Sequence, residues 1–369
     1  MGAYQILFMD VRDAAACSEA VSLAKKRGFG RLSGFVNGVL RTLVREKENL
    51  PVPDKKDDVK YVSITYSVPE WLSKLIIEQY GKESAEKIFA SFLEARPLTI
   101  RTNLSKTTPE ELEKELEEAG VKVEKGNYLP YAFTISNLNY LGKIAAFRQG
   151  KFAVQDESSQ LAVAIADINE GDFVLDVCAA PGGKSFTLAE YMENTGVLDA
   201  FDLYKGRVNL IKKGAERLDL SIIHAAVRDA ATGVCEKQYD RVLCDVPCSG
   251  LGVIRRKPEI RYKKQESFKE LPALQLKILE HSAQLVRPSG MLFYSTCTLR
   301  NAENGAVVTE FLKRHPEFEP YDLPEAEGIS HTVNEPKFMR TMMPMDHGGD
   351  GFFAAAMRRK TETGKETKR

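Results

Sequence analysis

The sequence has few cysteines, and they are scattered. Six occur in 369 residues, at irregular spacings and without a Cys-X-X-Cys pair, which excludes a disulfide framework and gives no zinc motif. A reducing cytosol is therefore the simplest setting. The chain also has no surplus of charge, because Lys and Arg number 52 and Asp and Glu number 52. A global electrostatic case for a nucleic-acid or membrane partner is thus missing, and any basic binding face must be local.

Long apolar runs are absent as well. No segment approaches the ~20 apolar residues that span a bilayer. Residues 1–6 lack the basic region of a signal peptide and the Ser or Thr of a myristoylation signal. These absences predict a cytoplasmic protein without a membrane partner.

The length of 369 residues predicts two or three domains. A stretch rich in Lys, Glu and Asp, with Pro51 and Pro53, predicts an exposed linker between residues 46 and 60. We divide the chain into a helical segment (1–50), a small α+β domain (60–148), an α/β domain (149–360) and a disordered tail (361–369).

Apolar periodicity predicts helices in the first part of the chain. Residues 35–45 place apolar side chains, Phe35 and Val39 among them, on one helical face. Residues 69–95 predict a helical stretch that is broken near Gly81.

The small domain alternates strand and helix patterns. Thr108-Pro109-Glu110-Glu111 is a capping box with proline at the first helical position. The predicted strands are at 98–103, 121–124 and 132–135. This arrangement is compatible with an RNA-recognition-like module but lacks its aromatic signature. Direct RNA contact and a purely structural spacer both remain open.

From residue 152 onward, strands and helices alternate in the rhythm of a doubly wound parallel sheet. The predicted strands are near 173–179, 197–202, 221–226, 241–245 and 291–296, and the predicted helices near 184–193, 205–218, 268–286 and 301–314. Ligands of such sheets bind at the carboxyl ends of the strands. The residues that follow each strand are therefore the candidates for chemistry.

A turn of small residues follows the first of these strands and opens directly into a helix. It reads Cys178-Ala179-Ala180-Pro181-Gly182-Gly183-Lys184, and the free N–H groups of the helix face it. It matches neither the dinucleotide fingerprint nor the P-loop, because Cys178 stands where the P-loop needs glycine. Dinucleotides and nucleoside triphosphates are thus disfavoured as ligands.

Two aspartates follow the next strands. Asp202 is placed to take both hydroxyls of a ribose, and Asp229 either binds an adenine amino group or caps the next turn. A nucleoside cofactor without a pyrophosphate group indicates S-adenosylmethionine. The turn and Asp202 together carry this prediction.

Two cysteines also follow strands on the ligand side. Cys248 and Cys297 are flanked by Pro, Ser, Thr or Gly, which suits a reactive thiolate. We expect Cys17, Cys235 and Cys244 to be small buried hydrophobic residues.

A thiolate that adds to carbon 6 of cytosine makes carbon 5 nucleophilic enough to accept a methyl group. Asp245 is placed to hold N3 and the exocyclic amine, and a second group such as Cys248 is placed to help remove the carbon-5 proton.

Three motifs in order resemble the RNA cytosine-5 methyltransferases of the Nop/Sun group. They are Asp-Val-Cys-Ala-Ala-Pro-Gly-Gly-Lys from residue 176, Cys-Asp-Val-Pro-Cys-Ser-Gly-Leu-Gly from residue 244, and Tyr-Ser-Thr-Cys-Thr from residue 294. The resemblance extends from about residue 60 to 360. It implies a Rossmann-like methyltransferase domain in which Cys297 is the nucleophile, Cys248 assists product release, and residues 178–184 with Asp202, Asp229 and Asp245 line the cofactor and base sites.

The first fifty residues are similar to the closing helices of the NusB-like domain found in ribosomal small-subunit members of that group, and the rest of that domain is missing. This likeness implies 16S rRNA as the substrate. Methylation of tRNA or another RNA is a rival within the class, and a non-catalytic rRNA-binding assembly factor is a rival outside it. We expect a monomer with no DNA partner.

The basic run Arg255–Lys264 is interpreted as a contact with RNA phosphates, with a solvated face as the alternative.

Overall fold

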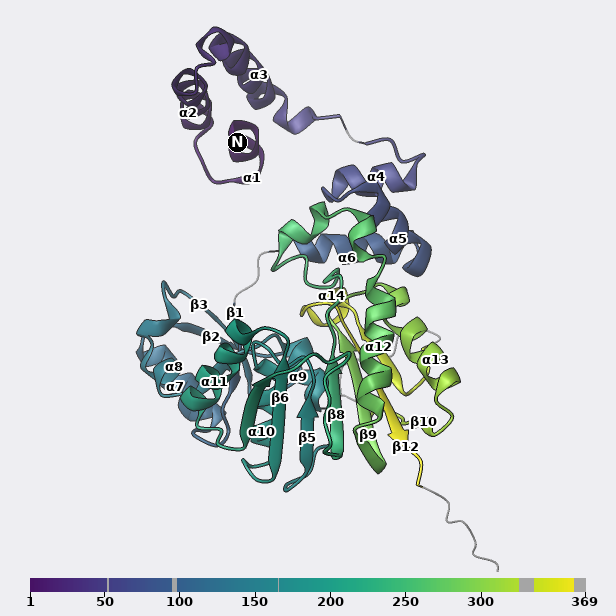
Figure 1. Ribbon diagram of the computed structural model, residues 1–369. Helices are drawn as coiled ribbons and strands as arrows, with labels where there is room; N and C mark the ends of the chain where they lie inside the picture. Colours follow the sequence, from purple (N-terminus) through teal and green to yellow (C-terminus); the bar gives the residue numbers. More distant parts are fainter. Residues whose placement is uncertain (52, 95–97, 165, 325–334, 362–369) are drawn as a thin grey trace, which may run out of the picture. The chain divides into compact units, whose positions relative to one another are not determined.

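The computed structural model describes residues 1–51, 53–94, 98–164, 166–324 and 335–361. The chain divides into two units, residues 1–57 and 58–369 (Figure 1). Residues 362–369 of the predicted tail lie outside the described residues. Among the described residues, no helix is long and apolar enough to cross a bilayer.

The first unit is a set of short helices. They are α1 (Gly2–Phe8), α2 (Asp13–Lys26) and α3 (Ser33–Glu46), with 3-10 turns at Gly30–Leu32 and Lys47–Asn49. The predicted helix at 35–45 lies within α3. Its small core centres on Ile6, Ala16 and Leu40. The predicted apolar face is only partly covered, because Phe35 is 71% exposed and Val39 50% exposed.

The second unit begins with three helices, α4 (Asp58–Thr65), α5 (Glu70–Tyr80) and α6 (Lys82–Leu93). Gly81 has φ +79° and separates α5 from α6, which confirms the predicted break. The apolar faces of these helices share one core with Leu251, Ile254 and Ile260. They therefore support the segment that follows Cys248.

The small sheet has the strand order β2-β3-β1-β4, and all its pairs are antiparallel. Its elements are β1 (Leu98–Thr102), α7 (Pro109–Glu118), β2 (Lys122–Lys125), β3 (Ala132–Ser136), a 3-10 turn (Leu141–Lys143), α8 (Ala145–Arg148) and β4 (Phe152–Val154). The predicted capping box forms, because Thr108 and Glu111 exchange side-chain and backbone hydrogen bonds. The sheet includes β4, which lies past residue 148.

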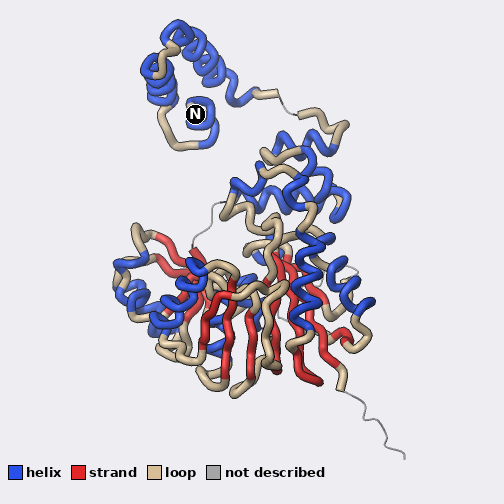
Figure 2. The backbone as a smooth tube through the Cα atoms, in the orientation of Figure 1, coloured by secondary structure: helices blue, strands red, loops and turns tan. Residues whose placement is uncertain are grey.

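The large sheet has the order β10-β12-β9-β8-β5-β6-β7, and β11 pairs with β12 (Figure 2). Its strands are β5 (Phe173–Asp176), β6 (Val197–Asp202), β7 (Ile223–Val227), β8 (Tyr239–Asp245), β9 (Val286–Thr296), β10 (Phe318–Pro320), β11 (Met339–Met342) and β12 (Phe352–Arg359). Strands β5 to β9 pair in parallel, as expected. The sheet is nevertheless mixed, because β10, β11 and β12 pair antiparallel, and the sequence analysis did not anticipate these three strands.

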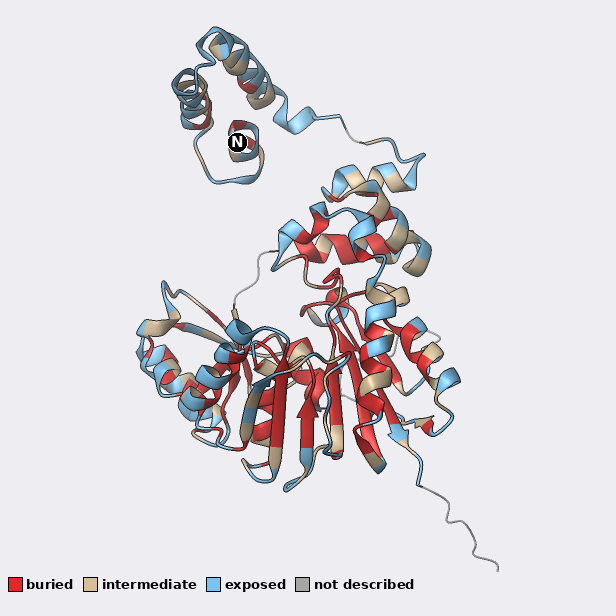
Figure 3. Cartoon of the chain, viewed as in Figure 1, coloured by how far each residue is buried: buried red, intermediate tan, exposed pale blue. Residues whose placement is uncertain are grey.

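Helices cover both faces of the large sheet. They are α9 (Glu157–Ala164), α10 (Gly183–Tyr191), α11 (Lys205–Leu218), α12 (Leu271–Ala283) and α13 (Gly305–Arg314), whereas the short α14 (Pro344–His347) contacts α6. Side chains of α9, α10 and α11 share one core with the sheet, and those of α12 and α13 share another. The central strands are buried for most of their length (Figure 3). This leaves the ends of the strands for binding.

Candidate active site

The turn after β5 has the tight geometry that its small residues allow. Gly182 has φ +114°, and a Cβ there would lie 2.2 Å from the Phe186 ring, so a larger residue would be strained. Gly183 begins α10, whose first N–H groups lie beside the turn. Ala179 and Pro181 complete the turn, which contributes Cys178 and Ala180 to the lining of a cavity.

This cavity has a volume of about 690 Å³ and lies at the carboxyl ends of the parallel strands. It brings together residues at the ends of five different strands, β5 to β9. Its lining includes the predicted residues Cys178, Ala180, Asp202, Asp229, Asp245, Cys248 and Cys297. The sequence analysis predicted this convergence.

The two aspartates that follow β6 and β7 differ in exposure. Asp202 is 3% exposed, accepts a hydrogen bond from the Tyr204 N–H at 3.2 Å and lies 3.4 Å from the Arg207 guanidinium. Asp229 is exposed and accepts hydrogen bonds from the Ala231 N–H and the Thr232 hydroxyl, which hold its pKa below the usual range. Asp229 therefore caps the next turn and also lines the cavity.

The carboxylates on the cavity wall indicate which chemical groups a bound ligand can present to them. They accept hydrogen bonds from hydroxyl and amine donors, and the lining also includes the cations Arg207, Arg228, Lys257 and Lys263. Alongside them, Cys178 and Ala180 offer a short apolar wall. A nucleoside that carries an amino acid group fits this set.

The two cysteine sulfur atoms lie 3.2 Å apart, close enough for a thiol–thiolate hydrogen bond. The Cys248 thiol lowers the pKa of Cys297 below its ordinary value, and the positive charges of Lys184 and Lys257 lower it further. The same hydrogen bond, together with burial, raises the pKa of Cys248. Cys297 is thus the sulfur that loses its proton more easily.

Asp245 joins Lys184, at the start of α10, to β9, the strand that precedes Cys297. Its Oδ2 accepts a hydrogen bond from Lys184 Nζ at 2.8 Å, and its Oδ1 accepts one from the Ser295 hydroxyl at 2.8 Å. Lys184 is 8% exposed, and its ammonium lies 4.7 Å from the centre of the Phe352 ring. Lys184 therefore fixes the Asp245 carboxylate at the cavity wall.

Three family models match this chain, and they follow one another along it. The model described as 16S rRNA methyltransferase RsmB/F matches residues 163–358, an RsmF/B-like ferredoxin-like domain matches 68–139, and the NusB family matches 1–45. The chain belongs to the RsmB/F family of methyltransferases.

Relatives of this RsmB/F member match over nearly its whole length. A probable ribosomal RNA small subunit methyltransferase B of Bacillus subtilis is 41% identical over 97% of this chain and 81% of its own. The corresponding protein of Synechocystis is 34% identical over 97% of this chain and 82% of its own. The crystal structure of PH0851 superposes with a TM-score of 0.82 at 30% identity, over 97% of this chain and 80% of that one. The expected methyltransferase fold is thereby confirmed.

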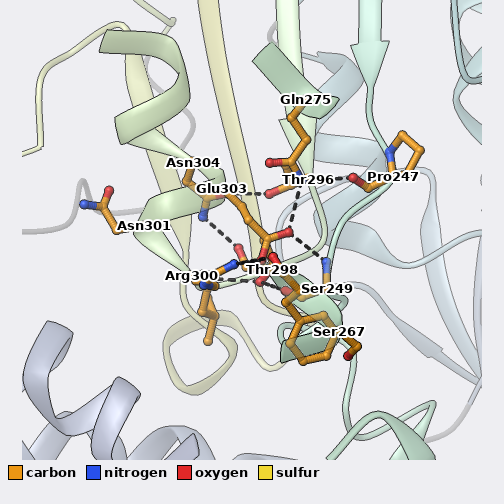
Figure 4. Close-up of polar contacts among 12 residues, drawn as sticks. Pro247, Ser249, Ser267, Gln275, Thr296, Thr298, Arg300, Asn301, Glu303 and Asn304 are labelled. Atoms are coloured by element: carbon orange, nitrogen blue, oxygen red, sulfur yellow. Dashed lines mark hydrogen bonds and ion pairs between the residues drawn. The ribbon is translucent and has the colours of Figure 1, made fainter. Parts of the chain in front are cut away.

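The sequence analysis missed a buried polar network that lies between the two cysteine loops of this RsmB/F chain (Figure 4). Its members are Ser249, Gln275, Thr296, Thr298, Glu303 and Asn304, each at most 2% exposed. The signal in the sequence was a pair of polar residues, Glu303-Asn304, directly before an apolar helix. The helix predicted at 301–314 includes both residues, whereas α13 begins at Gly305.

Part of the basic run 255–264 points inward, which corrects its interpretation as a continuous phosphate contact. Arg255 and Arg256 both pair with Asp350, and Arg256 also pairs with Asp156. Arg261 is 8% exposed. The lysines of the run are exposed, and two of them, Lys257 and Lys263, line the cavity.

The other cysteines lie outside the cavity. Cys17 and Cys244 are buried, as expected. Cys235 is partly buried, with its sulfur 3.6 Å from the Tyr239 hydroxyl. Within the described ranges, no group of three or more His, Cys, Asp or Glu side chains could hold a metal ion.

Proposed function

We propose that this protein transfers a methyl group from S-adenosylmethionine to carbon 5 of a cytosine in 16S rRNA, through a covalent bond between Cys297 and carbon 6. The observation that carries the proposal is the pair of sulfur atoms 3.2 Å apart in a cavity that also presents Asp202 and Asp245. The matched family model is described as a 16S rRNA methyltransferase, which supports rRNA as the substrate.

The cofactor half of the cavity suits this chemistry. Asp202 would hold the ribose hydroxyls, Asp229 would accept from the adenine amino group, and the turn at 178–184 would border the amino acid part. When bound, S-adenosylmethionine supplies an electrophilic methyl group on a sulfonium. The residues on this side bind and orient, and the cysteines and Asp245 act on the base.

The base half has a residue for each step. The Cys297 thiolate adds to carbon 6, and the electron pair of the 5,6 double bond becomes available at carbon 5 for the methyl group. Asp245, held by Lys184 and Ser295, would bind N3 and the exocyclic amine. Cys248 then assists removal of the carbon-5 proton, the double bond re-forms, and the bond from carbon 6 to sulfur breaks. Cys297 leaves as the thiolate that its lowered pKa favours.

The remaining assignments rest on the same proposal. We propose that residues 60–148 guide the RNA and that residues 149–360 carry the reaction. The ferredoxin-like family model over 68–139 supports a separate domain in this part of the chain. We also propose a cytoplasmic location for this enzyme. The expectation of a monomer stays a prediction.

The test incubates wild type, Cys297→Ser and Cys248→Ser with unmodified 16S rRNA and cofactor that carries a labelled methyl group. Nucleoside mass spectrometry detects 5-methylcytosine, and a denaturing gel detects protein–RNA adducts. We expect 5-methylcytosine with wild type, an accumulated adduct with Cys248→Ser, and neither with Cys297→Ser. Cys235→Ser, outside the cavity, is the matched control and should behave as wild type. Methylation of tRNA alone would contradict the substrate, and an adduct with Cys297→Ser would reverse the roles of the cysteines.

A further inference from the structure

Two consecutive residues, Glu303 and Asn304, lie between the two cysteine loops, just before α13 (Figure 4). Glu303 is 0% exposed and Asn304 is 2% exposed. A carboxylate this deeply buried is costly unless hydrogen bonds satisfy it. The positions of these bonds indicate what the residue holds.

Glu303 is connected by hydrogen bonds to both sequence neighbours of Cys248, Pro247 and Ser249. Its Oε2 accepts the backbone N–H of Ser249 at 2.8 Å and a hydrogen bond from Gln275 Nε2 at 3.0 Å. Gln275 Nε2 also donates to the Pro247 carbonyl at 2.9 Å. The residue before Cys248 and the residue after it are therefore tied to one carboxylate, directly or through a single amide.

Asn304 is connected in the same way to both sequence neighbours of Cys297, Thr296 and Thr298. Its Oδ1 accepts the Thr296 hydroxyl at 2.6 Å, and its Nδ2 donates to the Thr298 carbonyl at 2.9 Å. The hydroxyl groups of Ser249 and Thr298 lie 2.8 Å apart and join the two loops. Each neighbour of Cys248 is thus tied to Glu303 and each neighbour of Cys297 to Asn304, while the second Glu303 oxygen lies 3.4 Å from Arg300, three residues after Cys297.

We propose that Glu303 and Asn304 are positioning residues that divide the labour, with Glu303 placing Cys248 for product release and Asn304 placing Cys297 for attack. The inference rests on the proposed function for the identity of the two steps. The placement itself rests on the hydrogen bonds described above. Because one peptide unit carries both side chains, the two sulfur atoms are held in a fixed relation to each other.

Substituting Glu303 and substituting Asn304 should therefore slow two different steps of the reaction. Displacing a reacting group by about 1 Å can cost about 100-fold in rate. In Glu303→Ala the Cys297 loop keeps Asn304, so attack proceeds while release slows by up to about 100-fold, and the covalent adduct accumulates. In Asn304→Ala attack slows by a similar factor and little adduct forms at any time.

The experiment measures adduct formation and adduct decay separately, in single turnovers with 16S rRNA and cofactor. Glu303→Gln is the conservative variant, because its amide oxygen can still accept from the Ser249 N–H, and it should restore most of the release rate. Glu310→Ala, with a solvent-accessible side chain on α13, is the control for changes in that helix and should match wild type. A uniform slowing of both steps in Glu303→Ala would overturn the division of labour, as would unchanged rates.

A variant that misfolds would also slow both steps, so a second route to the Cys248 loop is needed. Gln275→Met removes the tie to Pro247 and also removes a buried Oε1 atom that has no hydrogen-bond partner, which limits the loss of stability. We expect it to slow release and spare attack, as Glu303→Ala does. Thermal unfolding midpoints of all variants identify any that are not folded, and equal effects of Gln275→Met on both steps would count against the proposal.

A readout without RNA keeps this inference separate from the proposed function. Diamide oxidises two nearby thiols to a disulfide, with both thiol protons and two electrons passing to the azo group. Wild type should form the Cys248–Cys297 disulfide rapidly, and Glu303→Ala and Asn304→Ala should form it about tenfold more slowly or worse, because the sulfur atoms are no longer held together. If no RNA gives an adduct but these rates differ, the proposed function fails and the positioning stands. If the rates are equal, the positioning fails.

Discussion

The Cys248 and Cys297 sulfur atoms lie 3.2 Å apart just beyond the ends of two neighbouring parallel strands, β8 and β9. The hydrogen bond between them acts in opposite directions on the two pKa values, lowering that of Cys297 and raising that of Cys248. At neutral pH this contact favours a thiolate at Cys297 and a thiol at Cys248. The asymmetry can be measured without any substrate.

Iodoacetamide should alkylate Cys297 at a lower pH than an ordinary cysteine. Thiolates are the reactive form, so a lowered pKa moves the rate profile to lower pH. In Cys248→Ala the hydrogen-bond donor is lost, the pKa of Cys297 rises, and the profile moves to higher pH. Each unit of that rise lowers the rate at neutral pH by about tenfold. Peptide mass spectrometry measures the modification of each cysteine separately.

Cys248→Ser is the matched control for this profile, because its hydroxyl can still donate to Cys297. It should fall between wild type and Cys248→Ala. Identical profiles for wild type and Cys248→Ala would show that the contact between the sulfur atoms does not set the reactivity of Cys297.

Cofactor affinity should depend on Asp202. Hydrogen bonds to a charged group contribute about 1.5–3 kcal/mol, so Asp202→Ala should weaken binding of S-adenosylmethionine by roughly 10- to 100-fold. Isothermal titration calorimetry gives the affinity. Asp240→Asn is the control, because Asp240 lies near the opposite end of β8 and pairs with Arg287. Undiminished affinity in Asp202→Ala would remove Asp202 from the cofactor site.

The basic run should separate into two classes by salt dependence. Lys263 is exposed beside the cavity, so Lys263→Gln should reduce the slope of log affinity for RNA against log salt by about 0.7 to 0.9 if it contacts one phosphate. Arg255 pairs with Asp350 at 3.2 Å, so Arg255→Gln should lower the thermal midpoint and leave the slope unchanged. Filter binding of an rRNA fragment at several salt concentrations gives the slopes. The reverse pattern would mean that Arg255 faces the RNA.

The ion pair of Arg101 with Glu190 should stabilise the contact between β1 and α10. Both side chains are at most 5% exposed, and burial raises the pKa of Glu190 even beside the guanidinium. Arg101→Met leaves a buried carboxylate without its partner, which should cost about 3–5 kcal/mol of unfolding free energy. Urea denaturation measures the loss. The double variant with Glu190→Met should recover most of it, and a harmless single substitution would show that the pair is not needed.

Local patterns were enough to predict the elements that carry the site. The apolar runs near residues 173, 197 and 241 become parallel strands, and the small residues after β5 form the turn that Gly182 requires. Convergence of Asp202, Asp245 and Cys297 followed from the rule that strand ends meet at one edge of the sheet. None of these predictions needed a long-range contact.

The features that were missed depend on partners far away in sequence. Arg256 turns inward because Asp156 and Asp350 receive it, and neither is near it in the chain. Residues 352–359 have no alternating pattern, because most of β12 is buried on both faces. Glu303 looked like a residue of a helix, since its partner Ser249 precedes it by more than fifty positions.

The position of β12 has a consequence for the order in which the site can form. This strand pairs with β9, which bears Cys297 at its end, and Gly351 just before it donates to the Gly252 carbonyl at 2.8 Å. During synthesis, β9 therefore remains an open sheet edge until residues near 359 have left the ribosome. A nascent chain can bury the β5–β8 core earlier, but it lacks the strand that braces the segment with Cys297. The cavity with the two cysteines is thus complete only after β12 has been made.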